Sequence, residues 1–384
     1  MKKILVIHNK YREIGGEDIA VENELTLLKK LFIVEEIIFD NNIKNLVKQT
    51  IYFLLNNNTE SNKLLSKKLK SFDPDLIFIH NTWFKVSLGV FKILKKSGKP
   101  IYLKLHNFRY NCTKSYITKK HLSGKNLCPA CGLKKESTGM FNKYFAESYI
   151  KSFLIIRYGK QYFKILKEDA LNLFVLTDFH KKYLKNLGFN ESKITVIPNY
   201  IHNDVEEIIK KKKDYILYAG RISEEKGLQE LISSFLGANV ESLSLYIIGS
   251  GPMLNFLQTK YSNNKKIKFL GPIENKLTLK LIKGSKAVVT ATKLYEGQPT
   301  LLCEASSLNV PSIFPDSGGI KEFFPETTEL MFKQDDYGDL QSKFQKILDS
   351  DLIQTEGQNN KIFIEEYLGH EKLRKLFYKS FDHE

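Results

Sequence analysis

The chain has 384 residues, 42% of them hydrophobic and 27% charged, which is typical of folded globular proteins and excludes a disordered chain. This length exceeds one ordinary hydrophobic core, so we expect two domains of similar size. No apolar run reaches the roughly 18 residues of a membrane-spanning helix, and the N-terminal run is too short for a signal peptide, so we expect a cytoplasmic protein.

The positive charge of the chain is confined to its first half. The formal net charge is +16, and residues 1–200 hold 35 lysines and arginines against 17 acidic residues. The remaining residues hold 24 against 26. This asymmetry indicates an anionic partner for the first half, such as nucleic acid, anionic lipid headgroups or phosphorylated lipids. A general bias of the proteome toward lysine is the alternative.

Short apolar runs alternate with helical patterns in the first half. The first run is KKILVIH (2–8), and its following loop ends in Gly15 and Gly16, before a helix expected from about Ile19. Further strands are expected at 34–40, 75–81, 101–107, 173–177 and 194–199, with helices at 86–97 and 178–187. Continuous apolar strands separated by helices predict a parallel sheet covered on both faces.

The second half repeats this scheme. Strands are expected at 214–220, 243–251, 267–273, 286–292 and 310–315, and helices at 226–236, 276–283 and 299–308. A last helical pattern, about 356–380, has no strand after it. The fold class predicted is therefore α/β, with two Rossmann-like domains in tandem. We expect the first domain at 1–200, the second at 201–357, and a C-terminal helix within 358–384 that returns to the first domain.

Ligands of such sheets bind beyond the carboxyl ends of the strands, so the residues that follow each strand carry the site prediction. Two domains that face each other would place this site in the cleft between them. After the strand at 214–220 come Arg221 and Lys226, in a loop that leads into a helix. Two cations at a helix N-terminus form a strong anion site. A surface ion pair with Glu224 or Glu225 is the alternative.

The stretch YEGQPTLLCEA, 295–305, follows the strand at 286–292 and places Glu296 before a helix and Glu304 within it. Pro299 suits the first turn of that helix. A diphosphate bound at the helix N-terminus would then have one carboxylate on each side. Carboxylates accept hydrogen bonds from vicinal hydroxyls, so a sugar and a ribose fit these positions, which together describe a nucleotide-sugar. Two ordinary helix-surface acids are the alternative.

The chain resembles the GT-B glycosyltransferases of the large retaining family 4. Six segments carry the resemblance: the E-x7-E pair Glu296 and Glu304, the Arg221 and Lys226 clamp in YAGRISEEKG, the glycine turn Gly15–Gly16 in IGGED, His106 in LKLHNFR, VIPN at 196–199, and GSGP at 249–252. The resemblance covers nearly the whole chain and implies the GT-B architecture, with two Rossmann-like domains facing across a cleft.

The resemblance also implies roles for individual residues. Arg221 and Lys226 would stabilise the leaving diphosphate, Glu296 would hold the sugar hydroxyls, and His106 would contact the sugar, although a structural strand-end histidine is its alternative. These four are the predicted catalytic residues. The predicted donor-binding residues are Gly15, Gly16, Gly251, Ile273, Gly297, Gln298, Thr300, Leu301 and Glu304. The family is retaining, so we expect retention, and the scheme requires no metal and no cofactor.

The predicted function is sugar transfer from a nucleotide-sugar, with UDP favoured over GDP, to a lipid-linked or saccharide acceptor in the synthesis of bacterial surface polysaccharide or glycolipid. A sugar-nucleotide epimerase or a phosphorylase on the same scaffold is the alternative enzyme. A zinc-containing nucleic-acid-binding protein is a more distant alternative, because no nucleic-acid motif is present and the paired acids would have no role.

Two further segments of the first half are noteworthy. In the stretch 112–132, Cys112, Cys128, Cys131 and His121 have the composition of a loose Cys3His zinc site, or are structural thiols. The stretch 143–167 mixes aromatic, aliphatic and basic residues and predicts an interfacial helix on an anionic membrane at the inner face of the cell.

The apolar face of that helix is predicted to consist of Tyr144, Tyr149, Phe153, Ile156 and Phe163, with charge supplied by Lys151, Lys160 and Lys164 among others. A helix packed on the first-domain core, with its lysines reaching into solvent, is the alternative.

Overall fold

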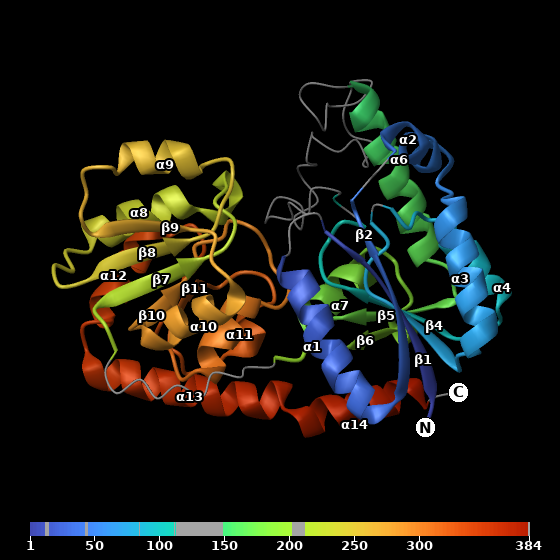
Figure 1. Ribbon diagram of the computed structural model, residues 1–384. Helices are drawn as coiled ribbons and strands as arrows, with labels where there is room; N and C mark the ends of the chain where they lie inside the picture. The colour runs from blue at the N-terminus through green and yellow to red at the C-terminus, as the bar shows by residue number, and fades with distance from the viewer. Residues whose placement is uncertain are drawn as a thin grey trace. The chain divides into compact units, whose positions relative to one another are not determined.

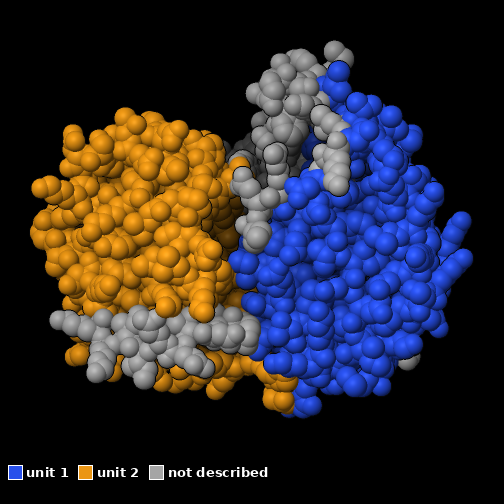
Figure 2. Space-filling view, viewed as in Figure 1, with its two compact units in different colours: residues 1–200, 373–384 blue, residues 201–372 orange. Residues whose placement is uncertain are grey.

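The computed structural model of the chain describes residues 1–11, 15–42, 45–83, 85–110, 112, 149–201 and 212–382. These residues form two compact units (Figures 1 and 2). Unit 1 comprises Met1–Tyr200 together with Leu373–Glu384, and unit 2 comprises Ile201–Lys372. The predicted end of the second domain at 357 therefore differs from the observed division, which falls after Lys372.

Unit 1 is built on a parallel sheet of six strands in the order β2-β1-β3-β4-β5-β6. Its strands are β1 Lys3–Lys10, β2 Ile33–Asp40, β3 Leu76–Ile79, β4 Ile101–Leu105, β5 Leu171–Val175 and β6 Ile194–Val196. Its helices are α1 Gly16–Leu31, α2 Leu46–Leu55, α3 Thr59–Phe72, α4 Val90–Lys96, α6 Tyr149–Leu166, α7 Asp178–Asn186 and the 3-10 turn η1 Glu191–Lys193. The central strands β3 and β4 are buried along their whole length, as expected for a sheet with both faces covered.

Unit 2 has a second parallel sheet of six strands, in the order β12-β11-β10-β7-β8-β9. Its strands are β7 Tyr215–Ala219, β8 Ser244–Ile248, β9 Ile267–Gly271, β10 Ala287–Val289, β11 Ser312–Pro315 and β12 Met331–Phe332. Its helices are α8 Leu228–Gly237, α9 Leu254–Lys260, α10 Asn275–Gly284, α11 Thr300–Ser307, α12 Tyr337–Lys346 and α13 Ser350–Leu368, with 3-10 turns η2 Glu224–Lys226 and η3 Ile320–Phe323. Both Rossmann-like sheets predicted from the sequence are confirmed.

The C-terminal helical pattern is two helices rather than the single predicted one. α13 ends at Leu368 and α14 spans His370–Phe381. Gly369 separates them with an extended backbone, and a Cβ at this position would lie 2.3 Å from the carbonyl oxygen of Glu365. The chain therefore turns at a residue whose missing side chain leaves room for the preceding helical turn.

The return of the C-terminal helix to the first domain is confirmed. Leu373, Phe377 and Phe381 of α14 are buried in the core of unit 1, where they pack with residues of α1 and of β1, β3, β4 and β5. The ring of Phe381 lies 4.9 Å from that of Tyr102, and Lys2 pairs with Asp382 at 2.9 Å. Figure 1 shows the two ends of the chain side by side in this unit.

Two sequence expectations concern membranes and metals. None of the described helices is long and apolar enough to span a membrane. The described residues contain no group of three metal-binding side chains, and Cys112 is buried. Cys128, Cys131 and His121 lie outside the described residues, so the predicted zinc site stays a prediction.

Candidate functional site

The strand order of unit 2 reverses between β7 and β10, and the loops after these two strands carry the predicted charged residues. In a doubly wound sheet this crevice is where ligands bind. Arg221 follows β7 and is exposed, and Lys226 ends the 3-10 turn just before α8. Glu296 follows β10 and precedes α11. Residues 70 positions apart in the sequence are therefore neighbours at one edge of the sheet.

Lys226 and Glu296 form an ion pair, with Nζ 2.5 Å from Oε1. Burial raises the pKa of Glu296, but the charge and hydrogen bond of Lys226 and a hydrogen bond from Thr292 lower it further, so the net pKa lies below its usual value. Glu296 is therefore a carboxylate at neutral pH. The two side chains remain about a quarter exposed, at 28% and 26%, so a ligand can reach both.

The loop that carries Glu296 is fixed by its neighbour after β11. The backbone N–H of Gly319 donates to the carbonyl oxygen of Glu296 at 2.9 Å, and the Ser317 hydroxyl donates to that of Leu294 at 3.0 Å. Gly318 has φ +60°, and a Cβ there would lie 2.7 Å from the Glu296 carbonyl oxygen. A side chain at Gly318 would displace the carboxylate, so this glycine positions it.

α11 begins directly after this loop, with Pro299 as its N-terminal flanking residue. The first N–H groups of the helix, at Thr300 and Leu301, have no partner within the helix and form an anion-binding end. Glu304 lies one turn further in and is buried. Burial raises its pKa to about 7, against a hydrogen bond from Asn275 that lowers it. Gln298 is buried and hydrogen-bonds the Cys303 thiol, and Gly297 is half-buried.

Glycines allow the loops after β7 and β8 to approach each other closely. Gly249 has φ +134°, and a Cβ there would lie 1.9 Å from the carbonyl oxygen of Gly220. A Cβ at Gly251 would lie 2.2 Å from the carbonyl oxygen of Ile222. Ile273, after β9, is half-buried. All predicted donor-binding residues of unit 2 are thus at the carboxyl edge of its sheet or on α11.

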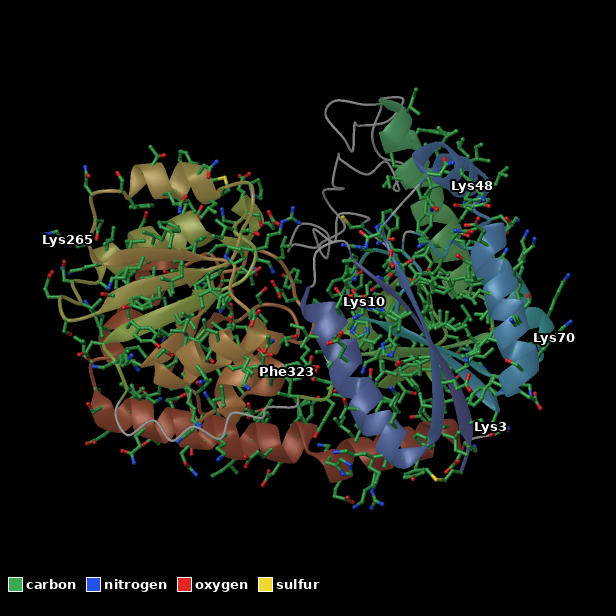
Figure 3. All side chains as sticks on the ribbon, viewed as in Figure 1. Lys3, Lys10, Lys48, Lys70, Lys265 and Phe323 are labelled. Carbon is green, nitrogen blue, oxygen red and sulfur yellow. The ribbon has the colours of Figure 1, made fainter. Side chains whose placement is uncertain are left out.

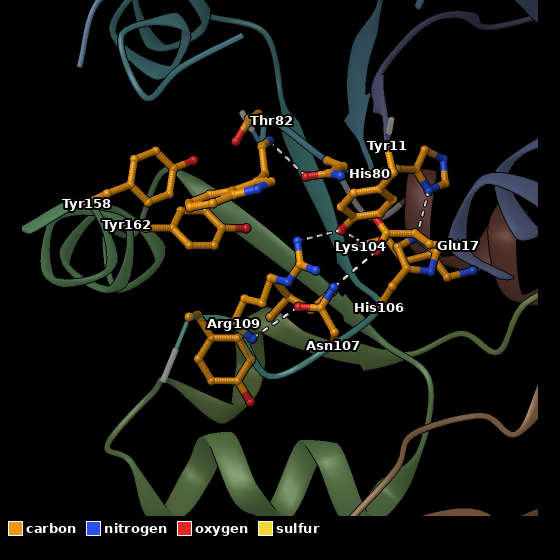
Figure 4. Close-up of a pocket in the computed structure, with 14 residues that line it drawn as sticks. Tyr11, Glu17, His80, Thr82, Lys104, His106, Asn107, Arg109, Tyr158 and Tyr162 are labelled. Carbon is orange, nitrogen blue, oxygen red and sulfur yellow. Dashed lines mark hydrogen bonds between the residues drawn. The ribbon is translucent and has the colours of Figure 1, made fainter. Parts of the chain in front are cut away.

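Unit 1 has a cavity of its own, of about 490 Å³, at the carboxyl ends of β1, β3 and β4 (Figure 4). This is again the point at which the strand order reverses, between β1 and β3. His106, from the end of β4, lines the cavity. Gly15 precedes α1, Gly16 begins it, and a Cβ at Gly15 would meet no atom within 4 Å, so the backbone there is open to a ligand.

One wall of the cavity is a cluster around Arg109. Its guanidinium lies 4.9 Å from the Tyr11 ring centroid and donates to the Tyr11 hydroxyl at 3.0 Å. That hydroxyl and the Asn107 amide each donate to Glu17 at 3.0 Å. Burial raises the pKa of Glu17, whereas Arg109 lowers it, and the net pKa is raised. Trp83, Tyr158 and Tyr162 add aromatic surface.

The deepest polar groups of unit 1 lie beneath this cavity. His106 Nε2 lies 3.0 Å from His80 Nδ1, and Lys104 Nζ lies 2.5 Å from Glu24 Oε1. Burial lowers the pKa of both histidines well below the usual value, so both rings are neutral. His80 and Glu24 were not among the predicted site residues. His80 follows the strand at 75–81, so the rule of examining each strand end would have found it.

The comparison with known proteins identifies the family. Residues 201–366 match the family described as "Glycosyl transferases group 1". The second unit belongs to glycosyl transferases group 1. The resemblance seen in the sequence is therefore confirmed for this family, and with it the GT-B pair of Rossmann-like domains.

Curated relatives of this glycosyltransferase family match parts of the chain. The O-antigen biosynthesis glycosyltransferase WbnH of Escherichia coli is 27% identical over 175 residues, 44% of this chain and 48% of the relative. An uncharacterized glycosyltransferase of Methanocaldococcus jannaschii is 26% identical over 274 residues, 65% of this chain and 57% of the relative. The chain thus spans about half the length of the curated relatives it matches.

Solved glycosyltransferase structures match the whole chain in fold. HepE of Anabaena, in complex with UDP-glucose, has a TM-score of 0.69 at 12% identity and covers 100% of both chains. The lipopolysaccharide outer core galactosyltransferase WaaB has a TM-score of 0.64 at 17% identity, with 98% of this chain and 99% of that chain covered. At these identities the likeness establishes the fold of the glycosyltransferase and not its substrates.

Proposed function

We propose that this chain is a retaining glycosyltransferase that moves a sugar from a UDP-sugar to a lipid-linked or saccharide acceptor. The observation that carries the proposal is the Lys226–Glu296 pair, with Nζ and Oε1 2.5 Å apart, beside the N-terminus of α11 at the reversal point of the sheet. An acid and a base at one helix end match a ligand that presents both anionic phosphates and neutral hydroxyls.

The cations act on the leaving group. As the bond between the anomeric carbon and the phosphate oxygen breaks, negative charge grows on the diphosphate. Arg221, Lys226 and the first N–H groups of α11 stabilise that charge, and one such donor in a preorganised site typically contributes about 3 kcal/mol to lowering the barrier. Fixed positive groups therefore replace a metal ion in this scheme.

The two acids hold hydroxyl groups on either side of the diphosphate. Glu296 is ionised because Lys226 pairs with it, so it accepts hydrogen bonds from the sugar hydroxyls. Glu304 accepts those of the ribose. His106 and the open backbone at Gly15 and Gly16 supply contacts from unit 1 to the sugar and the phosphates.

Retention follows from attack of the acceptor on the face that the leaving group occupies. The acceptor oxygen forms the new bond to the anomeric carbon as the bond to phosphate breaks, and the acceptor proton passes to the leaving phosphate oxygen. No covalent sugar–enzyme intermediate is required in this sequence of steps.

Names of the relatives favour particular substrates. The matching HepE structures are complexes with UDP or UDP-glucose, which supports UDP as the nucleotide. The E. coli relatives are named for O-antigen biosynthesis, which supports a surface polysaccharide as the product and a lipid-linked saccharide as the acceptor. We place the protein at the inner face of the membrane, where such acceptors are exposed.

A panel of UDP- and GDP-sugars tests this proposal. We expect a UDP-sugar to raise the melting temperature and to be hydrolysed slowly without acceptor. Lys226→Ala should lower kcat by about 10²- to 10³-fold, because one preorganised donor to the diphosphate is lost. Glu296→Ala should abolish turnover.

The matched control is Lys266→Ala, since Lys266 forms a similar pair with Glu241 at 2.6 Å but precedes β9, at the opposite edge of the same sheet. Full activity of Glu296→Ala, or equal losses in the two lysine variants, would contradict the assignment of the donor site.

A further inference from the structure

A line of buried polar side chains runs beneath the unit 1 cavity, and the proposed mechanism uses only its last member, His106. Lys104 and Glu24 are both 0% exposed and make a direct contact. Glu24 in turn faces His80, and His80 contacts His106. Buried ionisable groups are costly unless each has a partner, so the line calls for an explanation.

The contact between Lys104 and Glu24 fixes the state of one carboxylate oxygen. Lys104 Nζ lies 2.5 Å from Glu24 Oε1 and also donates to the carbonyl oxygen of Pro198 at 3.2 Å. Burial raises the pKa of Glu24 and lowers that of Lys104, while their mutual attraction opposes both shifts. Any shared proton lies between Nζ and Oε1. Oε2 therefore carries only lone pairs and can act only as an acceptor.

His80 faces that oxygen with its Nδ1 atom. Glu24 Oε2 lies 3.6 Å from His80 Nδ1, and among the described residues it has no hydrogen-bond partner. A lone pair on Nδ1 would point at an oxygen that also carries lone pairs, which is repulsive, whereas a proton on Nδ1 is attracted to it. The neutral His80 ring therefore holds its proton on Nδ1 and leaves Nε2 as the acceptor.

The tautomer of His80 determines that of His106. The Nδ1–H of His80 lies 3.0 Å from His106 Nε2, and the rings are nearly stacked with centroids 5.3 Å apart. His106 Nε2 must accept this hydrogen bond. A neutral His106 then holds its proton on Nδ1, an atom that is buried and without a partner among the described residues.

We propose that Lys104, Glu24 and His80 act as positioning residues that hold His106 as a neutral Nδ1–H donor at the cavity. The inference rests on the proposed function only for its consequence. His106 would then donate to an oxygen of the bound substrate and would not act as a general base, because its acceptor nitrogen is occupied by His80. This agrees with a mechanism in which the leaving phosphate takes the acceptor proton.

Nitrogen NMR of the full chain labelled with 15N-histidine tests the inference without any turnover. Each ring nitrogen shows a distinct shift when protonated, and His106→Gln and His80→Gln spectra assign the signals. We expect both histidines at neutral pH to show a protonated Nδ1 and an unprotonated Nε2. A His106 ring protonated at Nε2, or at both nitrogens, would overturn the proposal.

A substitution in the relay gives the second test. In Glu24→Gln, the amide oxygen faces Lys104 and the amide N–H group faces His80, so His80 Nδ1 becomes an acceptor. His106 should then move its proton to Nε2. The matched control is Glu22→Gln on the same helix, since Glu22 is exposed and pairs only with Lys10.

The variant readouts separate this inference from the donor-site proposal. Glu24→Gln should keep its affinity for a UDP-sugar within about twofold while kcat falls at least tenfold, because the loss is confined to His106. An unchanged His106 spectrum in folded Glu24→Gln would refute the relay. If this variant does not fold, the wild-type spectrum alone still decides the tautomer of His106, whatever the outcome of the activity assays.

Discussion

Glu296 and Glu304 illustrate how two similar residues acquire different chemistry from their surroundings. Glu296 lies beside Lys226 and has a lowered pKa, so it is charged at neutral pH. Glu304 is buried in α11, where the loss of solvent raises its pKa to about 7. A nucleotide that donates two ribose hydroxyls to Glu304 would favour its ionised form and lower this pKa again.

Glu304 therefore predicts a pH dependence of donor binding. In the free protein its carboxyl group is largely protonated below about pH 7, and binding of the ribose must displace that proton. The affinity for UDP-glucose should rise up to about tenfold from about pH 6 to pH 8 and then level off. Calorimetric titration measures this, and Glu304→Gln should give a flat profile. A sloping profile in that variant would assign the effect to another group.

The sequence predicted the charged residues of unit 2 better than those of unit 1. Lys226 and Glu296 both follow strands, so the topology alone brings them to one edge. Glu24 lies in the middle of α1, where its position resembles an ordinary helix acid. Its burial against Lys104 depends on the packing of α1 on the sheet, which no local pattern of residues encodes.

At the scale of elements, α2 and α6 form one surface of unit 1. The Phe53 and Tyr158 rings stack with centroids 5.5 Å apart, and Arg157 donates to the carbonyl oxygen of Leu54. The predicted apolar face of α6 is wrong in part, because Ile156 is buried in unit 1. The apolar residues left exposed on the two helices are Val47, Ile51, Leu54, Leu55, Ile150 and Phe153, which we term the α2–α6 patch.

We propose that the α2–α6 patch docks on an anionic membrane. Its most exposed members, Ile150 at 75% and Val47 at 73%, lie near lysines such as Lys48 on α2 (Figure 3). Lys160 and Lys164 of α6 are exposed as well. Apolar side chains among basic ones are typical of interfacial helices, and each buried side chain contributes about 2 kcal/mol.

Flotation with vesicles of anionic lipid tests the docking surface. The double change Ile150→Asp and Phe153→Asp should lower the bound fraction at least about tenfold, because two apolar groups become charged. Phe256→Asp provides the control, since Phe256 is 51% exposed on α9 of unit 2. A wild-type protein that fails to float at low salt would contradict the proposal, as would an equal effect of the control.

Element positions followed from the sequence more closely than element faces did. The predicted strands at 101–107 and 267–273 correspond to β4 and β9, each shorter at its carboxyl end. Runs of apolar residues identify a buried strand, but polar residues at its end leave the sheet to line a site. Helices α2 and α3 were not predicted, and neither was β12, which has two residues.

At the scale of the whole molecule, the chain closes on itself within unit 1. Phe377 of α14 is fully buried, with its ring 6.2 Å from Phe78 of β3 and 6.4 Å from Phe174 of β5. The sequence predicted this return because the last helical pattern had no strand after it. It did not predict that α13 stays with unit 2, since the break at Gly369 depends on a close backbone contact.

Phe377→Ala should destabilise unit 1 by about 3–5 kcal/mol, because a large core side chain is replaced by a cavity. Urea unfolding followed by tryptophan fluorescence measures this, since the single tryptophan of the chain, Trp83, lies in unit 1. Lys379→Ala, on the exposed side of the same helix, is the control. A midpoint for Phe377→Ala equal to that of the control would show that α14 adds little to the core.

The place of α14 has a consequence for synthesis on the ribosome. The first two hundred residues emerge long before Leu373, Phe377 and Phe381, which complete their core. The nascent N-terminal half must therefore wait, with part of its interior uncovered, while the later half is translated and folds. Native packing of the earlier-made half is completed last, after the final codons have been read.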